Sequence, residues 1–157
     1  TRKRVFSMAL VHERLYKSED FARVDFRKYI EEMTVHLLSV HRDKMETVRF
    51  EKDIKKTLID INKAVPLGLI LNELITNALK HAFPKDRAGK IKIKFNKKGS
   101  RYNLIISDNG IGFPKDLDFR KAESMGLTLI TSLVNQINGE IKLDRSKGTS
   151  FKINFSD

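Results

Sequence analysis

Residues 67–82 read LGLILNELITNALKHA, an apolar segment interrupted at regular intervals by polar side chains. Because each residue of an α-helix advances by about 100°, the leucines, isoleucines and alanines of this segment share one broad face. Its polar residues fall in a strip of roughly 100° along one edge of that face: Glu73, Asn77, Lys80 and His81. The pattern fits an ordinary amphipathic core helix. It also fits a helix that presents these groups to a metal ion and a charged ligand.

Residues 103–114 read NLIISDNGIGFP and begin as a strand. Alternate apolar side chains point to one face of that strand, namely Tyr102, Leu104 and Ile106. Asp108 comes next in the series, so its carboxylate points toward the core, where it needs a hydrogen-bond donor such as the exocyclic amine of adenine. A turn in which Asp108 caps the local backbone is the alternative. Gly110 and Gly112 then let the backbone turn sharply and approach a ligand closely.

Together the two segments resemble the nucleotide-binding boxes of the Bergerat ATPase superfamily, which includes histidine kinases, gyrase B, MutL and the heat-shock-90 chaperones. Residues 73–81 resemble the N box, and residues 108–112 resemble the first glycine box. Residues 124–130, SMGLTLI, lie where the second glycine box belongs, and residues 147–153, KGTSFKI, resemble the last box. Four boxes in the right order, over roughly residues 60–155, are far more specific than any one of them.

The sequence around the boxes narrows the resemblance to one subgroup of histidine kinases. Residues 11–16, VHERLY, and residues 72–83, NELITNALKHAF, are similar to the histidine kinase subgroup with the second type of dimerisation and phosphoacceptor domain. This implies that residues 1–20 are the end of a helical hairpin and that residues 21–157 are the ATP-binding catalytic domain. It also implies an acceptor histidine upstream of this chain. His12 is then expected to pack rather than to accept phosphate, and the fragment to bind ATP without phosphorylating itself.

The remaining periodicity predicts an α+β fold. Helical spacing predicts helices over residues 3–17, 29–42 and 127–138 beside the central helix, which has Pro66 near its start. Alternation and turn residues predict strands over residues 23–26, 48–54, 90–95, 102–107, 140–143 and 150–155. This order predicts a two-layer sandwich of helices on a sheet. The resemblance implies the Bergerat fold, a mixed, mostly antiparallel sheet covered on one face by helices.

The resemblance also implies roles for single residues. Asn77 takes the place of the asparagine that binds the Mg²⁺ bridging the ATP phosphates, and an amide oxygen suits that ion. Lys80 is placed to neutralise phosphate charge. His81 occupies a position beside the adenine, where it stacks or donates a hydrogen bond, or else it packs in the core. Thr149 contacts the pocket or only starts the last strand.

Glu73 departs from the asparagine that many histidine kinases carry at this position. The gyrase and MutL branches carry glutamate here, where it activates water for ATP hydrolysis, and kinases of the similar subgroup show glutamate too. Glu73 is therefore either a general base or a ligand of a water on Mg²⁺. The first alternative allows a rival function, a self-contained ATPase switch.

The second glycine box is reduced, because Gly126 stands where several glycines are common. The lid before it, residues 113–124, is short. The backbone amides of Met125, Gly126 and Leu127 are expected to supply the phosphate contacts, at the start of the following helix. A reduced box also allows a second rival, a non-catalytic module that binds a nucleotide or a partner.

The composition of the 157 residues limits the remaining classes. There is no cysteine, so disulfides and zinc–thiolate sites are excluded, and a cytoplasmic domain is expected. The net charge of +11 is spread over short clusters, and residues 90–95 alternate so that their lysines form a solvent face. Nucleic acid is therefore not the expected partner. The resemblance implies a response-regulator receiver domain as partner and a homodimer in the full protein.

Overall fold

The computed structural model describes residues 23–112 and 126–157. The predicted helix over residues 3–17, His12, the lid and Met125 lie outside the described residues. In the two described ranges, every helix is too short or too polar to serve as a membrane span.

The main sheet has five strands in the order β2-β4-β5-β7-β6. Their bounds are Val48–Ile54 for β2, Gly89–Lys98 for β4, Arg101–Asp108 for β5, Glu140–Asp144 for β6 and Thr149–Ser156 for β7. The β2–β4 pair is parallel, and the other three pairs are antiparallel. The predicted mixed, mostly antiparallel sheet is thus confirmed. A separate pair joins β1, Arg23–Asp25, to β3, Leu58–Asp60, a strand that the sequence did not predict.

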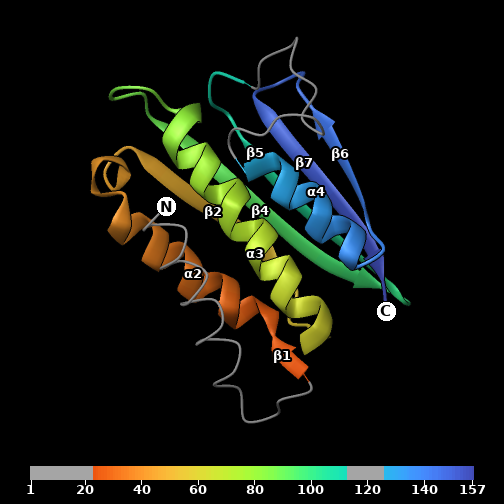
Figure 1. The fold of residues 1–157 in the computed structure, drawn as a ribbon. Coiled ribbons are helices and arrows are strands. Elements are labelled where there is room, and N and C mark those ends of the chain that lie inside the picture. The colour runs from red at the N-terminus through yellow and green to blue at the C-terminus, as the bar shows by residue number, and fades with distance from the viewer. Residues whose placement is uncertain (1–22, 113–125) are drawn as a thin grey trace.

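Three α-helices lie over one face of the main sheet, as Figure 1 shows. They are α2, Phe26–Val40, α3, Ile61–Asn77, and α4, Leu127–Gln136. The 3₁₀-helix η1, Arg42–Lys44, follows α2, and the π-helix η2, Ala78–Ala82, continues α3. The opposite face of the sheet carries the predicted lysines, of which Lys90 is exposed and Lys92 and Lys94 are partly exposed. The expected two-layer sandwich is therefore confirmed.

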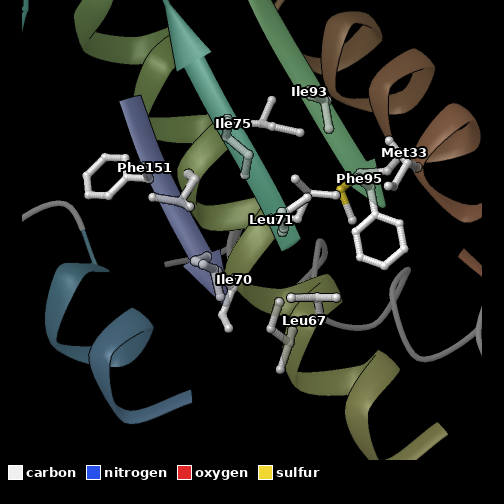
Figure 2. Close-up of a cluster of buried hydrophobic side chains, with 14 of the residues drawn as sticks. Met33, Leu67, Ile70, Leu71, Ile75, Ile93, Phe95 and Phe151 are labelled. Carbon is white, nitrogen blue, oxygen red and sulfur yellow. The ribbon is translucent and has the colours of Figure 1, made fainter. Parts of the chain in front are cut away.

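Helix α3 supplies the centre of the core. Its inward side chains are each 0% exposed: Leu67, Ile70, Leu71 and Ile75. Figure 2 shows them close to Ile93 and Phe95 of the sheet and Met33 of α2. Full burial of one such side chain is worth about 1.5–3 kcal/mol. Packing of this kind therefore fixes the position of α3 against the sheet more firmly than helix propensity does.

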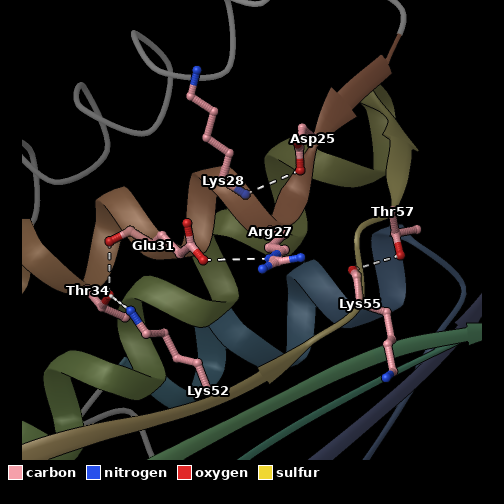
Figure 3. A network of polar contacts seen from close by, with 8 residues as sticks. All are labelled: Asp25, Arg27, Lys28, Glu31, Thr34, Lys52, Lys55 and Thr57. Atoms are coloured by element: carbon pink, nitrogen blue, oxygen red, sulfur yellow. Dashed lines mark hydrogen bonds and ion pairs between the residues drawn. The ribbon is translucent and has the colours of Figure 1, made fainter.

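Polar contacts fix α2 at its start and along its length (Figure 3). Asp25 caps the helix, because its Oδ1 accepts a hydrogen bond from the backbone amide of Lys28 at 3.3 Å. Lys52 of β2 donates from Nζ to Thr34 Oγ1 at 3.5 Å. The contact joins α2 to the edge strand of the sheet.

Helix α3 begins earlier than the sequence predicted. Asp60 caps it by accepting a hydrogen bond at Oδ1 from the amide of Asn62, at 2.8 Å. Pro66 is consequently inside the helix, beyond the first turn, and lacks the amide that would bond to the carbonyl of Asn62. The expectation that Pro66 lies near the start was wrong, because the cap at Asp60 is a stronger start signal than the proline.

Candidate functional site

A cavity of about 270 Å³ lies between the end of α3 and one end of the sheet. The helical wall comes from α3 and η2 and consists of Leu74, Asn77, Ala78, His81 and Ala82. The end of β5 and the loop after it supply Ile106, Asp108, Ile111 and Gly112. The start of α4 and β7 supply Leu127, Thr149 and Phe151. Most of these side chains are apolar, and the few polar groups among them can orient a ligand.

The polar residues of the helix do not all reach the cavity. The structure brings Asn77 and His81 to its wall, whereas Glu73 and Lys80 are not among the lining residues. Glu73 lies within α3 and is only 5% exposed. Lys80 is exposed and lies in η2. A π-helix bonds residue i to i+5, so its side chains advance by less than an α-helical step.

His81 is exposed at the rim of the cavity, which rules out the packed core histidine. Partial burial lowers the pKa of His81, and the charge of Lys80 beside it lowers this pKa further. A neutral imidazole at neutral pH offers one donor and one acceptor nitrogen to a ligand.

Asp108 is the only acid among the lining residues of the described cavity. It ends β5 in register with Ile91 on one side and Thr149 on the other. Its Oδ1 accepts a hydrogen bond from the amide of Gly110 at 2.9 Å, so the capping interpretation is confirmed. Burial raises the pKa of the Asp108 carboxyl, and backbone hydrogen bonds from Gly110 and Thr149 oppose that rise. The carboxylate therefore both holds the local turn and faces the cavity.

Gly110 packs closely against the end of η2. A Cβ at this position would lie 2.3 Å from the carbonyl oxygen of Ala82, a distance that no real contact reaches. The same carbonyl accepts a hydrogen bond from the amide of Ile111 at 2.9 Å. Gly110 is thus needed for close approach to the helix, whereas the sequence suggested approach to a ligand.

Gly148 allows a similar close approach, between the start of β7 and the end of β5. Its φ is +71°, and a Cβ there would lie 2.2 Å from the carbonyl oxygen of Asp108. Thr149, which follows it, is the first residue of β7 and also lines the cavity, so it does more than start the last strand. The sequence contained Gly148 within the last box but gave no reason for it.

The second glycine box is described only from Gly126 onward. Gly126 caps α4 with a φ of +67° and is buried, while Leu127 lines the cavity. The sequence analysis did not assign six apolar lining residues to the site: Leu74, Ala78, Ala82, Ile106, Ile111 and Phe151. The parity of β7 could have found Phe151, because it shares the face of Thr149.

The described residues, 23–112 and 126–157, contain no group of three or more His, Cys, Asp or Glu side chains that could hold a metal ion. Mg²⁺ does not require such a group, because it keeps several waters and is often bound by one or two protein oxygens and substrate phosphates. Asn77, half-buried on the cavity wall, offers one amide oxygen and therefore fits such a site.

Two family models match the chain. One, described as histidine kinase-, DNA gyrase B-, and HSP90-like ATPase, matches residues 62–157. The other, described as histidine kinase, matches residues 1–41. The first match contains every residue that lines the cavity.

Curated proteins and solved structures agree with these models. The chain is 27% identical over 154 residues to the sensor histidine kinase PdtaS of Mycobacterium tuberculosis (strain CDC 1551 / Oshkosh), covering 94% of this chain and 30% of that protein. It is 37% identical over 98 residues to the sensor histidine kinase YdfH of Bacillus subtilis (strain 168), covering 61% of this chain and 23% of that protein. The histidine kinase domain of the blue-light activated histidine kinase EL346 from Erythrobacter litoralis has the same fold, with a TM-score of 0.84 and 19% identity over 99% of this chain and 73% of that chain. The chain thus spans less than a third of the two curated relatives.

Proposed function

The chain belongs to the histidine kinase-, DNA gyrase B-, and HSP90-like ATPase family, and from this premise we propose that it is the ATP-binding catalytic domain of a two-component sensor histidine kinase. The full protein transfers the γ-phosphoryl group of ATP to a histidine upstream of this chain. A response-regulator aspartate then receives it. The observation that carries the proposal is the half-buried Asp108 carboxylate in the wall of an otherwise mainly apolar cavity.

Adenine is the group that this cavity suits. Asp108 accepts a hydrogen bond from the exocyclic amine, which compensates the carboxylate for its loss of water. Leu74, Ile106 and Phe151 provide apolar surface for the faces of the base. The cavity volume of about 270 Å³ is just below the usual range for ligand pockets, about 300–1,000 Å³, so the cavity holds the base and leaves the phosphates at the rim.

The phosphates then lie at the rim of the cavity, beside the polar residues of α3 and η2, where we propose four contacts. Asn77 holds Mg²⁺ through its amide oxygen, Lys80 neutralises phosphate charge from the exposed rim, and His81 lies beside the nucleotide. Backbone amides of residues 125–127, at the N-terminus of α4, bind phosphate oxygens. Bound Mg²⁺ supplies charge neutralisation for phosphoryl transfer. The protein contributes mainly by positioning the γ-phosphate for the incoming histidine.

Glu73 lies four residues before Asn77 on α3, buried and off the described cavity wall. This position favours a role through the Mg²⁺ water over direct proton abstraction from a histidine or a water. It also counts against the rival ATPase switch, which needs Glu73 to act as a general base.

Residues 1–20 are proposed to be the end of the dimerisation and phosphoacceptor hairpin, and residues 21–157 the catalytic domain. The histidine kinase model that matches residues 1–41 supports a hairpin at this end of the chain. A homodimer, a receiver domain as partner and a cytoplasmic position of the domain follow from the same proposal.

Isothermal titration of the chain with ATP, with and without Mg²⁺, tests the site. We expect Asp108→Asn to weaken binding at least about tenfold, since hydrogen bonds to charged groups are worth about 1.5–3 kcal/mol. Asn77→Ala should remove most of the gain from Mg²⁺, and Asp53→Asn, an exposed residue of β2, should change neither. Absence of binding by the wild type would favour the non-catalytic module.

Transfer chemistry needs a separate test with the full protein, which supplies the acceptor histidine. Labelled phosphate from ATP should appear on histidine and then on a receiver domain. Steady release of phosphate by this chain alone, lost in Glu73→Ala, would support the ATPase switch instead.

A further inference from the structure

Lys44 is a buried lysine that is not among the residues lining the described cavity. It is 6% exposed and ends η1, between α2 and β2. Lysine is almost never buried to this extent unless its ammonium is paired. The nearby carboxylate of Asp43, with Oδ2 3.8 Å from Nζ, is 75% exposed and is a weak partner.

The ammonium is held mainly by two backbone carbonyls. Lys44 Nζ donates to the carbonyl oxygen of Phe83 and to that of Lys85, the latter at 3.2 Å. Phe83 is the C-cap of η2, so the cation lies at the C-terminal end of the long α3–η2 helix. Carbonyls there have no partner within the helix, and a positive charge is favourable beside them.

The same turn is connected directly to the cavity. Ala82, one residue before Phe83, lines the cavity and accepts the amide of Ile111 at 2.9 Å. His81 and Ile111 line it as well. A displacement of the Phe83 carbonyl therefore moves one helical wall of the cavity together with the first glycine box.

The backbone around Lys44 is rigidly joined to this turn. Its carbonyl accepts the amide of Thr47 at 3.2 Å, and the carbonyl of Thr47 accepts the amide of Gly89 at 3.0 Å. A Cβ on Gly89 would lie 2.1 Å from the ring of Phe83, which is 0% exposed. Lys44, Phe83 and Gly89 therefore form one packed unit.

We propose that Lys44 is a positioning residue of the nucleotide site. Its ammonium fixes the end of η2, and through Ala82 and Ile111 it sets the distance between the helical wall and the glycine box. The proposal rests on the proposed function, because the cavity that Lys44 positions is the proposed ATP site.

Lys44→Met tests this, since it keeps the length of the side chain and removes the charge and its two hydrogen bonds. Lys63→Met is the matched control, because Lys63 Nζ also donates to a backbone carbonyl, that of Ile137 at 3.2 Å, and neither residue lines the cavity. Both variants should unfold at lower temperature. In titrations with ATP, we expect at least about tenfold weaker binding for Lys44→Met only, because only this variant releases the helical wall of the cavity.

A second readout needs no nucleotide. Amide hydrogen exchange at Ile111 in the free protein should accelerate at least about tenfold in Lys44→Met and not in Lys63→Met. The two readouts separate the two proposals. A wild type that fails to bind ATP overturns the proposed function, whereas the exchange rate at Ile111 still tests the positioning role of Lys44.

If Lys44→Met does not fold, Lys44→Ala is measured with and without ethylammonium, which can refill the space of the ammonium. Recovery of slow exchange at Ile111 and of ATP affinity supports the proposal. A folded Lys44→Met with wild-type ATP affinity and wild-type exchange at Ile111 overturns it, and so does the absence of any rescue of Lys44→Ala by ethylammonium.

Discussion

Substituting alanine at three glycines separates two costs to stability: the strain of a left-handed backbone, and the steric overlap of the new Cβ with neighbouring backbone. Gly99, in the turn between β4 and β5, has a φ of +62° and open space around its Cβ position. Gly110 lacks a positive φ, but its Cβ would lie 2.3 Å from the carbonyl oxygen of Ala82. Gly148 combines a φ of +71° with a Cβ position 2.2 Å from the carbonyl oxygen of Asp108.

The expected losses in the free energy of unfolding follow from these distances. Gly99→Ala costs the backbone strain of a left-handed alanine alone, about 1–2 kcal/mol. Gly110→Ala costs about 1–3 kcal/mol of overpacking, because the obstacle is backbone and cannot rotate away. Gly148→Ala incurs both costs and should lose about 2–5 kcal/mol.

Urea unfolding measures these losses, and ATP titration shows whether they reach the site. Gly99→Ala should bind ATP as the wild type does, because its turn lies at the end of β5 opposite to Asp108. Gly110→Ala and Gly148→Ala should bind at least about tenfold more weakly, since a change of about 1.4 kcal/mol at the site suffices. Wild-type stability of Gly110→Ala, together with unchanged ATP affinity, would refute the close approach of the glycine box to η2.

Two further predictions concern the free protein. Burial raises the pKa of Asp108 in the fold, so the folded state holds this proton more tightly than the unfolded state does. The free-energy cost of burying the ionised Asp108 carboxylate is absent below the ordinary pKa of an aspartate, and it develops as pH rises through the folded pKa. Asp108→Asn should therefore melt at a higher temperature than the wild type at pH 7, but not in strong acid. Within residues 23–112 and 126–157, the buried Tyr29 hydroxyl has no hydrogen-bond partner, so Tyr29→Phe should gain up to about 1 kcal/mol of stability. Tyr102→Phe should lose a similar amount, because the Tyr102 hydroxyl donates to Asp157 at 2.6 Å.

Thermal and urea unfolding across pH check both predictions. A melting temperature of Asp108→Asn that stays below the wild type at every pH would show that the Gly110 and Thr149 hydrogen bonds outweigh the burial of the charge. A loss in Tyr29→Phe equal to that in Tyr102→Phe would mean that the Tyr29 hydroxyl is paired in solution.

The sequence predicted the strands of the main sheet well, because one face of each is buried and the apolar residues alternate. Its prediction of β2 has the observed bounds, Val48–Ile54. It missed β3, whose three residues, LID, are too few to show a period and pair only with the equally short β1. It also took Pro66 to lie near the start of the central helix, whereas α3 begins at Ile61, directly after the Asp60 cap.

The sequence indicated which residue types form the candidate site, but not which of these side chains reach the cavity. Asp108 could be placed on the inner face of β5 from parity alone. Only Asn77 and His81 of the helical strip line the described cavity. The wheel assumes a constant 100° step and continues it through residues 78–82, which include Lys80 and where the helix is a π-helix. The sequence also gives no sign that Glu73 would be only 5% exposed. Lys44 was invisible for a similar reason: its partners are backbone carbonyls 39 and 41 residues away, and any sequence can supply a carbonyl.

The cavity walls come from α3 with η2, the end of β5, the start of α4 and the start of β7, which are far apart in the chain. No single helix or strand supplies all of these lining residues, so ligand affinity and the folding of the entire unit are linked quantities. A nucleotide at 100 times its dissociation constant would add about 2.7 kcal/mol to the stability of every part of the structure that unfolds with the cavity. Conversely, a fault far from the cavity, in β6 for example, would be measured as poor nucleotide binding. In a cell, the supply of ATP would then help to decide how much of this domain is folded.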